Sequence, residues 1–239
     1  MEQLTVQQRT ALIAEIETAK FLLRDGLRAV LEVDPSNPSY RAPLFLVAQG
    51  LERLMKVAWC LTQLESGEPL PTSWSVRNLF GHDLVRLLGA MSEIASGPAY
   101  RDQSVAQRAD ADFLASDPFL RLFIRAVTAF GDGSRYEDLN AFLDPTYRRL
   151  ADPDTEFAEL ETFVLDAHPN LRSRLTSPDL SKVYRTLNTD LVEAMKSEVV
   201  TTTQRLMRAV GRFFVWGPCG GLGQQFSAQI MEFVSRHDH

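Results

Sequence analysis

Apolar residues recur along this chain at steps of three and four, and this spacing constrains the fold more than any other feature. The clearest stretch begins at Pro43, which suits a first helical position. Its apolar stripe consists of Leu44, Val47, Leu51, Leu54, Ala58 and Leu61. Such a stripe is typical of an amphipathic helix, and no segment keeps the period of two that a half-buried strand requires. The sequence therefore predicts an all-α fold of about eight helices.

Residues that commonly begin helices precede several of these stripes. Thr5 and Gln8 form a capping box, in which the threonine hydroxyl accepts from the first turn and the glutamine side chain reaches back. Ser104 is expected to cap a short helix that ends near residue 115, and a further helix is expected from Gly81 to Ile94. These signals indicate where the predicted helices begin.

The longest periodic stretch runs from Pro178 to Trp216. As one straight helix it would be roughly 57 Å long at 1.5 Å per residue. A globule of this chain length is only about 45 Å across. We therefore expect the helix either to break near residues 188–190 or to protrude, and a protruding helix would need a partner. The β-branched run at residues 199–203 lies within the stretch, but the apolar stripe keeps its register there, so a helix is expected.

A chain of 239 residues is long enough for one large domain or for one domain with an appendage. Area scaling predicts that about 70% of the unfolded surface is buried on folding, which is ample for a core without disulfides or metals. A seam near residues 145–175 would divide a helical bundle at residues 1–150 from a C-terminal helical region at residues 151–239 that packs on it. The alternative is one continuous domain.

The chain is acidic, with 25 basic and 31 acidic residues and a formal net charge of −6. This balance argues against a surface that coats nucleic acid and against a polybasic membrane patch, although it leaves room for a local phosphate site. The apolar runs are far too short to span a bilayer. The start of the chain lacks the features of a secretory signal. Two cysteines do not make a disulfide framework, so we expect a cytoplasmic protein with reduced thiols and no membrane partner.

The stretch from Arg77 to His82 carries the residue types that metal-free RNA cleavage needs. The histidine can give and take protons near neutral pH. The arginine can clamp a phosphate and stabilise the charge on pentacoordinate phosphorus. Asn78 between them can orient a ribose hydroxyl or the imidazole. On one straight helix the arginine and the histidine would point about 140° apart, so they converge only if the chain bends, and Gly81 is where it can.

Arg77-Asn78-Leu79-Phe80-Gly81-His82 resembles the Arg-x4–6-His motif of the HEPN superfamily, named for nucleotide-binding proteins of higher eukaryotes and prokaryotes. Two neighbouring stretches, Gly50 to Lys56 and Gly81 to Leu88, are similar to helices found around that motif. The resemblance covers about residues 5–150. It implies an up-and-down helical bundle, with additional helices at the C-terminus of this chain. Such a bundle is often dimeric, with the arginines and histidines of two subunits near a shared cleft.

The resemblance also implies a function and roles for the residues of the motif. Active members are metal-independent endoribonucleases of toxin–antitoxin, abortive-infection and CRISPR systems. We therefore expect an enzyme of the toxin or phage-defence type that cuts single-stranded RNA, needs no cofactor, forms a homodimer and meets an antitoxin or another protein partner. By this resemblance His82 would be the acid/base, Arg77 the phosphate-binding residue and Asn78 the polar helper.

A second interpretation stays open. His82 could instead cap a helix or bond a backbone carbonyl, with Asp83 as its partner. Other members of the superfamily lack activity and serve as interaction or ligand-binding bundles. The acidic surface and the long stretch at residues 178–216 favour this alternative, in which the chain is a non-catalytic bundle that binds a protein partner or a small ligand.

Other polar residues are weaker candidates. Arg135, after a Gly-Ser turn, would supply a second anion contact near the bundle end. Glu52, Arg53 and Lys56 are expected to form a solvated or salt-bridged face. The glycine-rich segment around Cys219 could approach a phosphate, although a tight interhelix connection explains it better. No zinc-binding or P-loop motif is present, so no metal site is expected.

Overall fold

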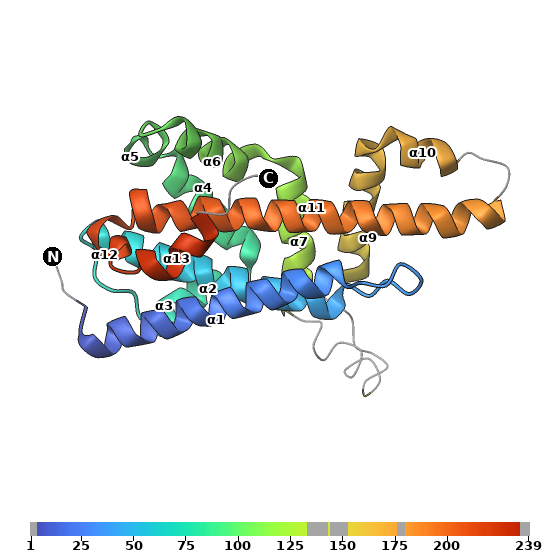
Figure 1. Cartoon of the computed structure of the whole chain (residues 1–239). Helices are drawn as coiled ribbons and strands as arrows, with labels where there is room; N and C mark the ends of the chain where they lie inside the picture. Colours follow the sequence, from blue (N-terminus) through green and yellow to red (C-terminus); the bar gives the residue numbers. More distant parts are fainter. Residues whose placement is uncertain (1–3, 133–142, 144–152, 176–179, 235–239) are drawn as a thin grey trace.

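The computed structural model describes residues 4–132, 143, 153–175 and 180–234, and the elements in these ranges are all helical (Figure 1). The all-α prediction is therefore confirmed for the described part of the chain. Its helices are α1 (Val6–Leu31), α2 (Arg41–Glu65), α3 (Ser73–Phe80), α4 (Leu84–Ser96), α5 (Pro98–Arg101), α6 (Val105–Ser116), α7 (Pro118–Asp132), α9 (Pro153–Ala167), α10 (Pro169–Leu175), α11 (Leu180–Trp216), α12 (Gly220–Gln224) and α13 (Ser227–Val234).

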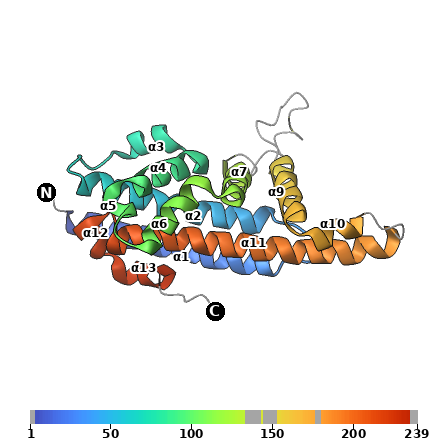
Figure 2. The same ribbon diagram turned by 90° about the horizontal axis from the view of Figure 1, so that it is seen from above.

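The long helices α1 and α2 form a closely packed pair along one side of the molecule (Figures 1 and 2). Two glycines allow this approach. A Cβ atom added at Gly50 of α2 would lie 2.6 Å from Cγ of Leu23 on α1, and one added at Gly26 of α1 would lie 2.9 Å from Cγ2 of Val47 on α2. Real Cβ atoms essentially never approach other atoms so closely. A larger residue at either glycine would therefore push the two helices apart.

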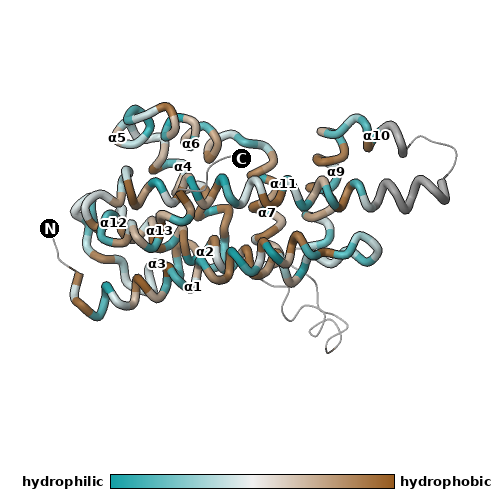
Figure 3. The backbone as a smooth tube through the Cα atoms, in the orientation of Figure 1, coloured by the Kyte–Doolittle hydropathy of each residue, from teal (hydrophilic) through white to brown (hydrophobic). Residues whose placement is uncertain are grey.

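Buried apolar side chains from both predicted regions form one continuous cluster. In one aromatic contact, the rings of Tyr40 and Phe157 lie 4.6 Å apart between centroids, which joins the start of α2 to α9. In another, the rings of Tyr100 and Phe213 meet edge to face at 4.8 Å and join α5 to α11. Hydrophobic and hydrophilic segments alternate along α1 and α11, as expected for helices with one face in the core (Figure 3).

Helix α11 is a single element of 37 residues. The expected break near residues 188–190 is absent, and the β-branched run at residues 199–203 is helical as predicted. Its C-terminal half lies along α1 and α2, whereas its N-terminal end extends beyond them beside α10 (Figures 1 and 2). At 1.5 Å per residue the helix is about 56 Å long. The second of the two expected outcomes, a protruding helix, is therefore the one observed.

A buried polar network attaches α5 and α6 to α11. The carboxylate of Asp110 accepts hydrogen bonds from both the Tyr100 hydroxyl, at 2.9 Å, and the Arg212 guanidinium, at 2.6 and 2.7 Å. The side-chain amide of Gln107 donates to the Trp216 carbonyl at 2.9 Å. Burial and the neighbouring Asp110 raise the pKa of Tyr100, so its hydroxyl stays a donor. These contacts join segments about a hundred residues apart in the chain.

The expected helix starts are largely confirmed. Thr5 and Gln8 make both hydrogen bonds of the capping box, and Ser104 accepts from Gln107 at the start of α6. Arg135 and residues 145–152 of the predicted seam lie outside the described residues. Within the described ranges, no helix combines the length and the apolar character needed to cross a bilayer.

Candidate functional site

The Arg77–His82 motif begins in a short helix, α3, that sequence analysis did not predict. The Thr72 hydroxyl caps its start by accepting from the Ser75 backbone N–H at 3.1 Å. Phe80 is the buried residue of the helix, and its ring meets Trp59 of α2 edge to face at 5.0 Å between centroids. This contact anchors the end of α3 against α2, so that the residues after Phe80 lie over the middle of α2.

Gly81 ends α3 and turns the chain. Its φ of +53° lies in the left-handed region, where a side chain is strained. Its backbone N–H donates to the Arg77 carbonyl at 2.8 Å, and the next helix, α4, begins only at Leu84. The motif therefore does not lie on one straight helix, and the bend that the sequence requires for Arg77 and His82 to converge is present at the expected residue.

Behind the turn, His82, Glu52 and Lys56 form a hydrogen-bonded cluster. The imidazole Nδ1 of His82 lies 3.0 and 3.2 Å from the two carboxylate oxygens of Glu52. The Lys56 ammonium donates to the same carboxylate at 2.6 Å and to the Gly81 carbonyl at 2.5 Å. The two residues on α2 thus hold both the ring and the backbone of the turn, each through a charge-assisted hydrogen bond.

The two partners in this cluster, Glu52 and His82, differ in exposure to solvent. The Glu52 side chain is only 11% exposed, whereas the His82 side chain is 53% exposed. A carboxylate only accepts hydrogen bonds, so Nδ1 must carry the proton in this pair. In the neutral ring this leaves Nε2 as the unprotonated nitrogen. The arrangement provides one oriented base with access to solvent.

Arg77 and Asn78 lie on the exposed surface of α3, just before the turn. In the part of the chain that the structure describes, neither side chain makes a hydrogen bond or an ion pair. The Arg77 guanidinium is therefore available for an external anion. Trp74, three residues earlier on the same helix, is 72% exposed. Residues spaced by three are neighbours on a helix surface, so an exposed aromatic ring flanks the arginine.

Asp83 has a different role from the one considered for it as a partner of His82. Its carboxylate accepts from the Arg86 backbone N–H at 3.0 Å and caps the start of α4, and it also pairs with the Arg86 guanidinium at 3.2 Å. The histidine is paired with Glu52 instead. Asp83 therefore fixes the beginning of α4, and Arg135, the other candidate for binding, lies outside the described residues.

The glycine-rich segment near Cys219 is occupied by the protein itself. The Glu65 carboxylate accepts from the backbone N–H groups of Gly221, at 3.1 Å, and Leu222, at 3.4 Å. These are the groups that a phosphate would need. Cys219 is fully buried, which raises the pKa of its thiol, and burial raises the pKa of Cys60 to about 11. Neither thiol is therefore activated as a nucleophile.

Sequence analysis expected Glu52 and Lys56 to belong to a solvated or salt-bridged face, and the two do form a salt bridge at 2.6 Å. It missed their contacts with His82 and with the Gly81 carbonyl. A glutamate and a lysine four residues apart usually form a solvated pair on a helix surface. The available signal was position, because Glu52 directly follows Leu51 and precedes Leu54 and Met55, all of which are completely buried. An acid inside an apolar stripe requires a partner. Among the described residues, no group of three or more histidine, cysteine or acidic side chains could hold a metal ion.

Comparison of the chain with protein-family models, curated proteins and solved structures finds no match.

Proposed function

We propose that the chain is a metal-independent endoribonuclease that cuts single-stranded RNA at the site formed by His82, Arg77 and Asn78. The observation that carries this proposal is the solvent-exposed imidazole of His82, held at Nδ1 by the largely buried carboxylate of Glu52. Such a pair fixes the tautomer and leaves Nε2 free to take a proton.

The proposed reaction needs a base, an anion clamp and an acid. Nε2 of His82 takes the proton of the ribose 2′-hydroxyl, the 2′-oxygen bonds to phosphorus, and the bond from phosphorus to the 5′-oxygen breaks. The imidazolium then returns the proton to the 5′-oxygen, leaving a 2′,3′-cyclic phosphate. Arg77 stabilises the charge on the phosphoryl oxygens, and Asn78 orients the ribose. The exposed ring of Trp74 is suited to stack an unpaired base.

The decisive experiment is cleavage of a fluorescent single-stranded RNA by the full chain in EDTA. We expect His82→Ala and Arg77→Ala each to lower the rate by at least about 10²-fold. His168→Ala is the matched control, because His168 is also exposed and lies 3.8 Å from a carboxylate, that of Glu198. Arg108→Ala, on the exposed face of α6, is the arginine control. If His82→Ala and Arg77→Ala cut as fast as the unaltered chain, this site is not the nuclease.

The resemblance to HEPN proteins extends the proposal to the assembly and the cellular role. We propose a homodimer in which two copies of the site share a cleft, and a toxin or phage-defence role that is restrained by a protein partner such as an antitoxin. Sedimentation of the full chain tests whether it forms a homodimer. Growth arrest on expression, relieved by His82→Ala, tests the toxin role, and a monomeric, harmless chain that still cuts RNA would contradict both.

A further inference from the structure

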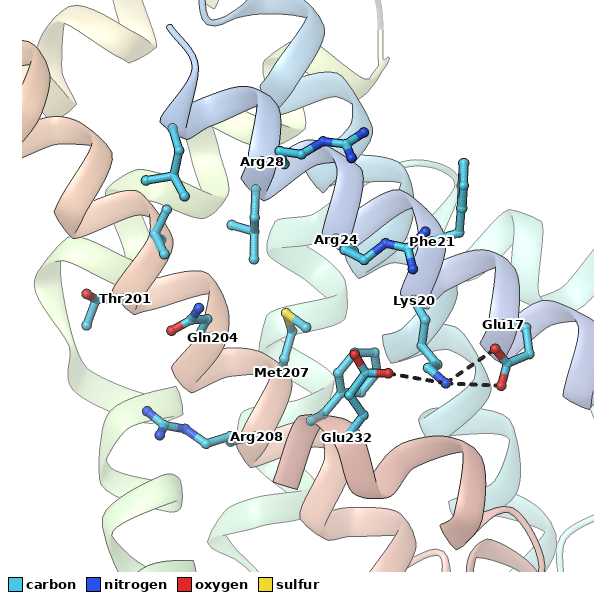
Figure 4. Close-up of a pocket in the computed structure, with 14 residues that line it drawn as sticks. Glu17, Lys20, Phe21, Arg24, Arg28, Thr201, Gln204, Met207, Arg208 and Glu232 are labelled. Carbon is cyan, nitrogen blue, oxygen red and sulfur yellow. Dashed lines mark hydrogen bonds and ion pairs between the residues drawn. The ribbon is translucent and has the colours of Figure 1, made fainter. Parts of the chain in front are cut away.

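A groove of about 720 Å³ lies between α1, α11 and α13 (Figure 4). None of the residues assigned to the candidate nuclease site lines it. Its volume falls within the range of small-molecule sites, which are mostly apolar with a few polar groups that set orientation. It is therefore a separate feature that the proposed ribonuclease activity does not use.

The floor of the groove is apolar. Leu27 of α1, Met207 of α11 and Phe233 of α13 line it, and each is buried. Phe21 and Leu31 of α1 also line it, but they are 55% and 56% exposed. Large apolar side chains that continue from a buried floor to an open rim indicate a surface that binds an apolar group.

The groove is also elongated. The residues that α1 contributes lie on one face of the helix from Glu17 to Leu31, which is about 21 Å at 1.5 Å per residue. The residues of α11 form the opposite wall over the shorter interval from Val200 to Arg208. An apolar surface that runs for this length between two helices fits an extended alkyl chain better than a compact ring system.

The rim carries an excess of positive charge. Arg24 and Arg28 lie along the same helix, and Arg208 lies across the groove on α11 (Figure 4). Both arginines of α1 are mostly exposed, and they share the single carboxylate of Asp25 at 3.5 and 3.4 Å. Two guanidinium groups on one carboxylate leave a net positive charge, although the chain as a whole carries −6.

The remaining lysine is already neutralised. Lys20 lies 3.2 Å from Glu17 and 3.5 Å from Glu232 of α13, and this three-residue cluster stands at one end of the groove (Figure 4). The ammonium at that end is therefore occupied by carboxylates of the protein, so an incoming anion is attracted to the arginines further along α1. The charges thus give a bound amphiphile one orientation.

We propose that this groove binds a single-chain anionic amphiphile, with its alkyl chain over Leu27, Met207 and Phe233 and its anionic head on Arg24 and Arg28. Guanidinium groups bind carboxylate and phosphate through charge-assisted hydrogen bonds. A fatty carboxylate and an alkyl phosphate share this chemistry. The proposal is independent of the ribonuclease, because it uses other residues on other elements.

The test is calorimetric titration of the full chain with decanoate, with decyl phosphate and with decan-1-ol, each below the concentration at which it aggregates. We expect one saturable site for at least one of the two anions. Arg24→Gln/Arg28→Gln should weaken anion binding at least tenfold and leave alcohol binding unchanged. Arg108→Gln, which removes an exposed arginine on α6, should change neither.

A second variant blocks the groove without entering the core. Thr201 is exposed and lies on the α11 wall, so Thr201→Trp should weaken binding of all three compounds while melting remains cooperative. Absence of a saturable site for both anions would overturn the proposal. So would equal anion affinity in the double arginine variant, or unchanged binding in Thr201→Trp. Whether decanoate or decyl phosphate binds more tightly identifies the head group.

Discussion

At the scale of single residues, the candidate site depends on a division between a buried acid and an exposed base. Glu52 is placed on α2 by the apolar stripe on either side of it, and it contributes to the proposed reaction only through His82. It is therefore a positioning residue, whereas His82 is the group that would touch RNA. Lys56 compensates the charge of Glu52 and fixes the turn at Gly81 through its carbonyl.

The first prediction concerns this acid. Glu52→Gln keeps the size of the side chain but removes its charge and offers an amide that can donate to the ring, so the tautomer of His82 is no longer fixed. We expect kcat to fall by about 10²-fold and KM to change little. Nitrogen-15 spectra of the imidazole should show the proton on Nδ1 in the unaltered chain and a mixture in the variant.

A conservative replacement distinguishes a role of Glu52 in positioning His82 from a role in folding alone. Glu52→Asp retains the charge but shortens the side chain, so it should recover part of the rate through a longer contact with the ring. Glu15→Gln, which removes an exposed carboxylate paired with Arg53 at 2.6 Å, is the surface control. A normal kcat in Glu52→Gln would show that the carboxylate only supports the fold.

At the scale of elements, the sequence predicted long helices better than short ones. The stripes of α1, α2 and α4 and the caps Thr5 and Ser104 are local signals, so they can be read without knowing the fold. Helix α3 has eight residues and a single buried one, Phe80, so it has no stripe to detect. The unbroken α11 was undecided, because residues 188–190 permit a new start and only contacts elsewhere determine whether one is used.

In the candidate site too, the residues close together in sequence were predicted, whereas the distant partner of His82 was not. The sequence shows Arg77, Asn78 and His82 within six consecutive residues, and the turn at Gly81 was anticipated from the same segment. Glu52 lies thirty residues earlier in the chain. Its contact with His82 depends on how α3 is anchored through Phe80 and Trp59, which is tertiary packing that local spacing does not encode.

The second prediction belongs to the contact between α6 and α11. Arg212→Met leaves the Asp110 carboxylate buried without its cation, and breaking a buried pair in this way costs about 3 kcal/mol or more. Arg101→Met breaks the exposed pair with Asp112 and should cost less than about 1 kcal/mol. Urea denaturation measures both, and equal midpoints would mean that the buried network does not hold α11.

At the scale of the whole molecule, stability should depend on pH through Glu161 of α9. Burial raises the pKa of this carboxyl above its ordinary value of 4.5. The folded protein therefore holds the proton more tightly than the unfolded chain does, so the free energy of unfolding decreases as the pH rises through the folded-state value. The stabilising contribution is fully present below pH 4.5 and is lost above the raised pKa.

The third prediction follows from this loss of stability at higher pH. Glu161→Gln imitates the protonated form, so we expect it to raise the urea midpoint at pH 7 and to leave it unchanged at pH 4. Glu68→Gln, an exposed residue after α2, should leave the difference between the two pH values as in the unaltered chain. A lower midpoint at pH 7 in Glu161→Gln would show that the charged carboxylate is favourable in the fold.

The two sites also differ in when the growing chain can form them. Glu52 and Lys56 on α2 contact His82 and Gly81 in the turn after α3, and these pairs are 30 and 25 residues apart in the chain. Arg77 lies within the same interval, so the site is formed by contacts that are short in sequence. The groove needs α1 to meet α11 and α13 across most of the chain, and such distant contacts form slowly. During synthesis the proposed nuclease site can therefore form before the C-terminal helices of the chain leave the ribosome. The proposed amphiphile groove forms only in the finished protein.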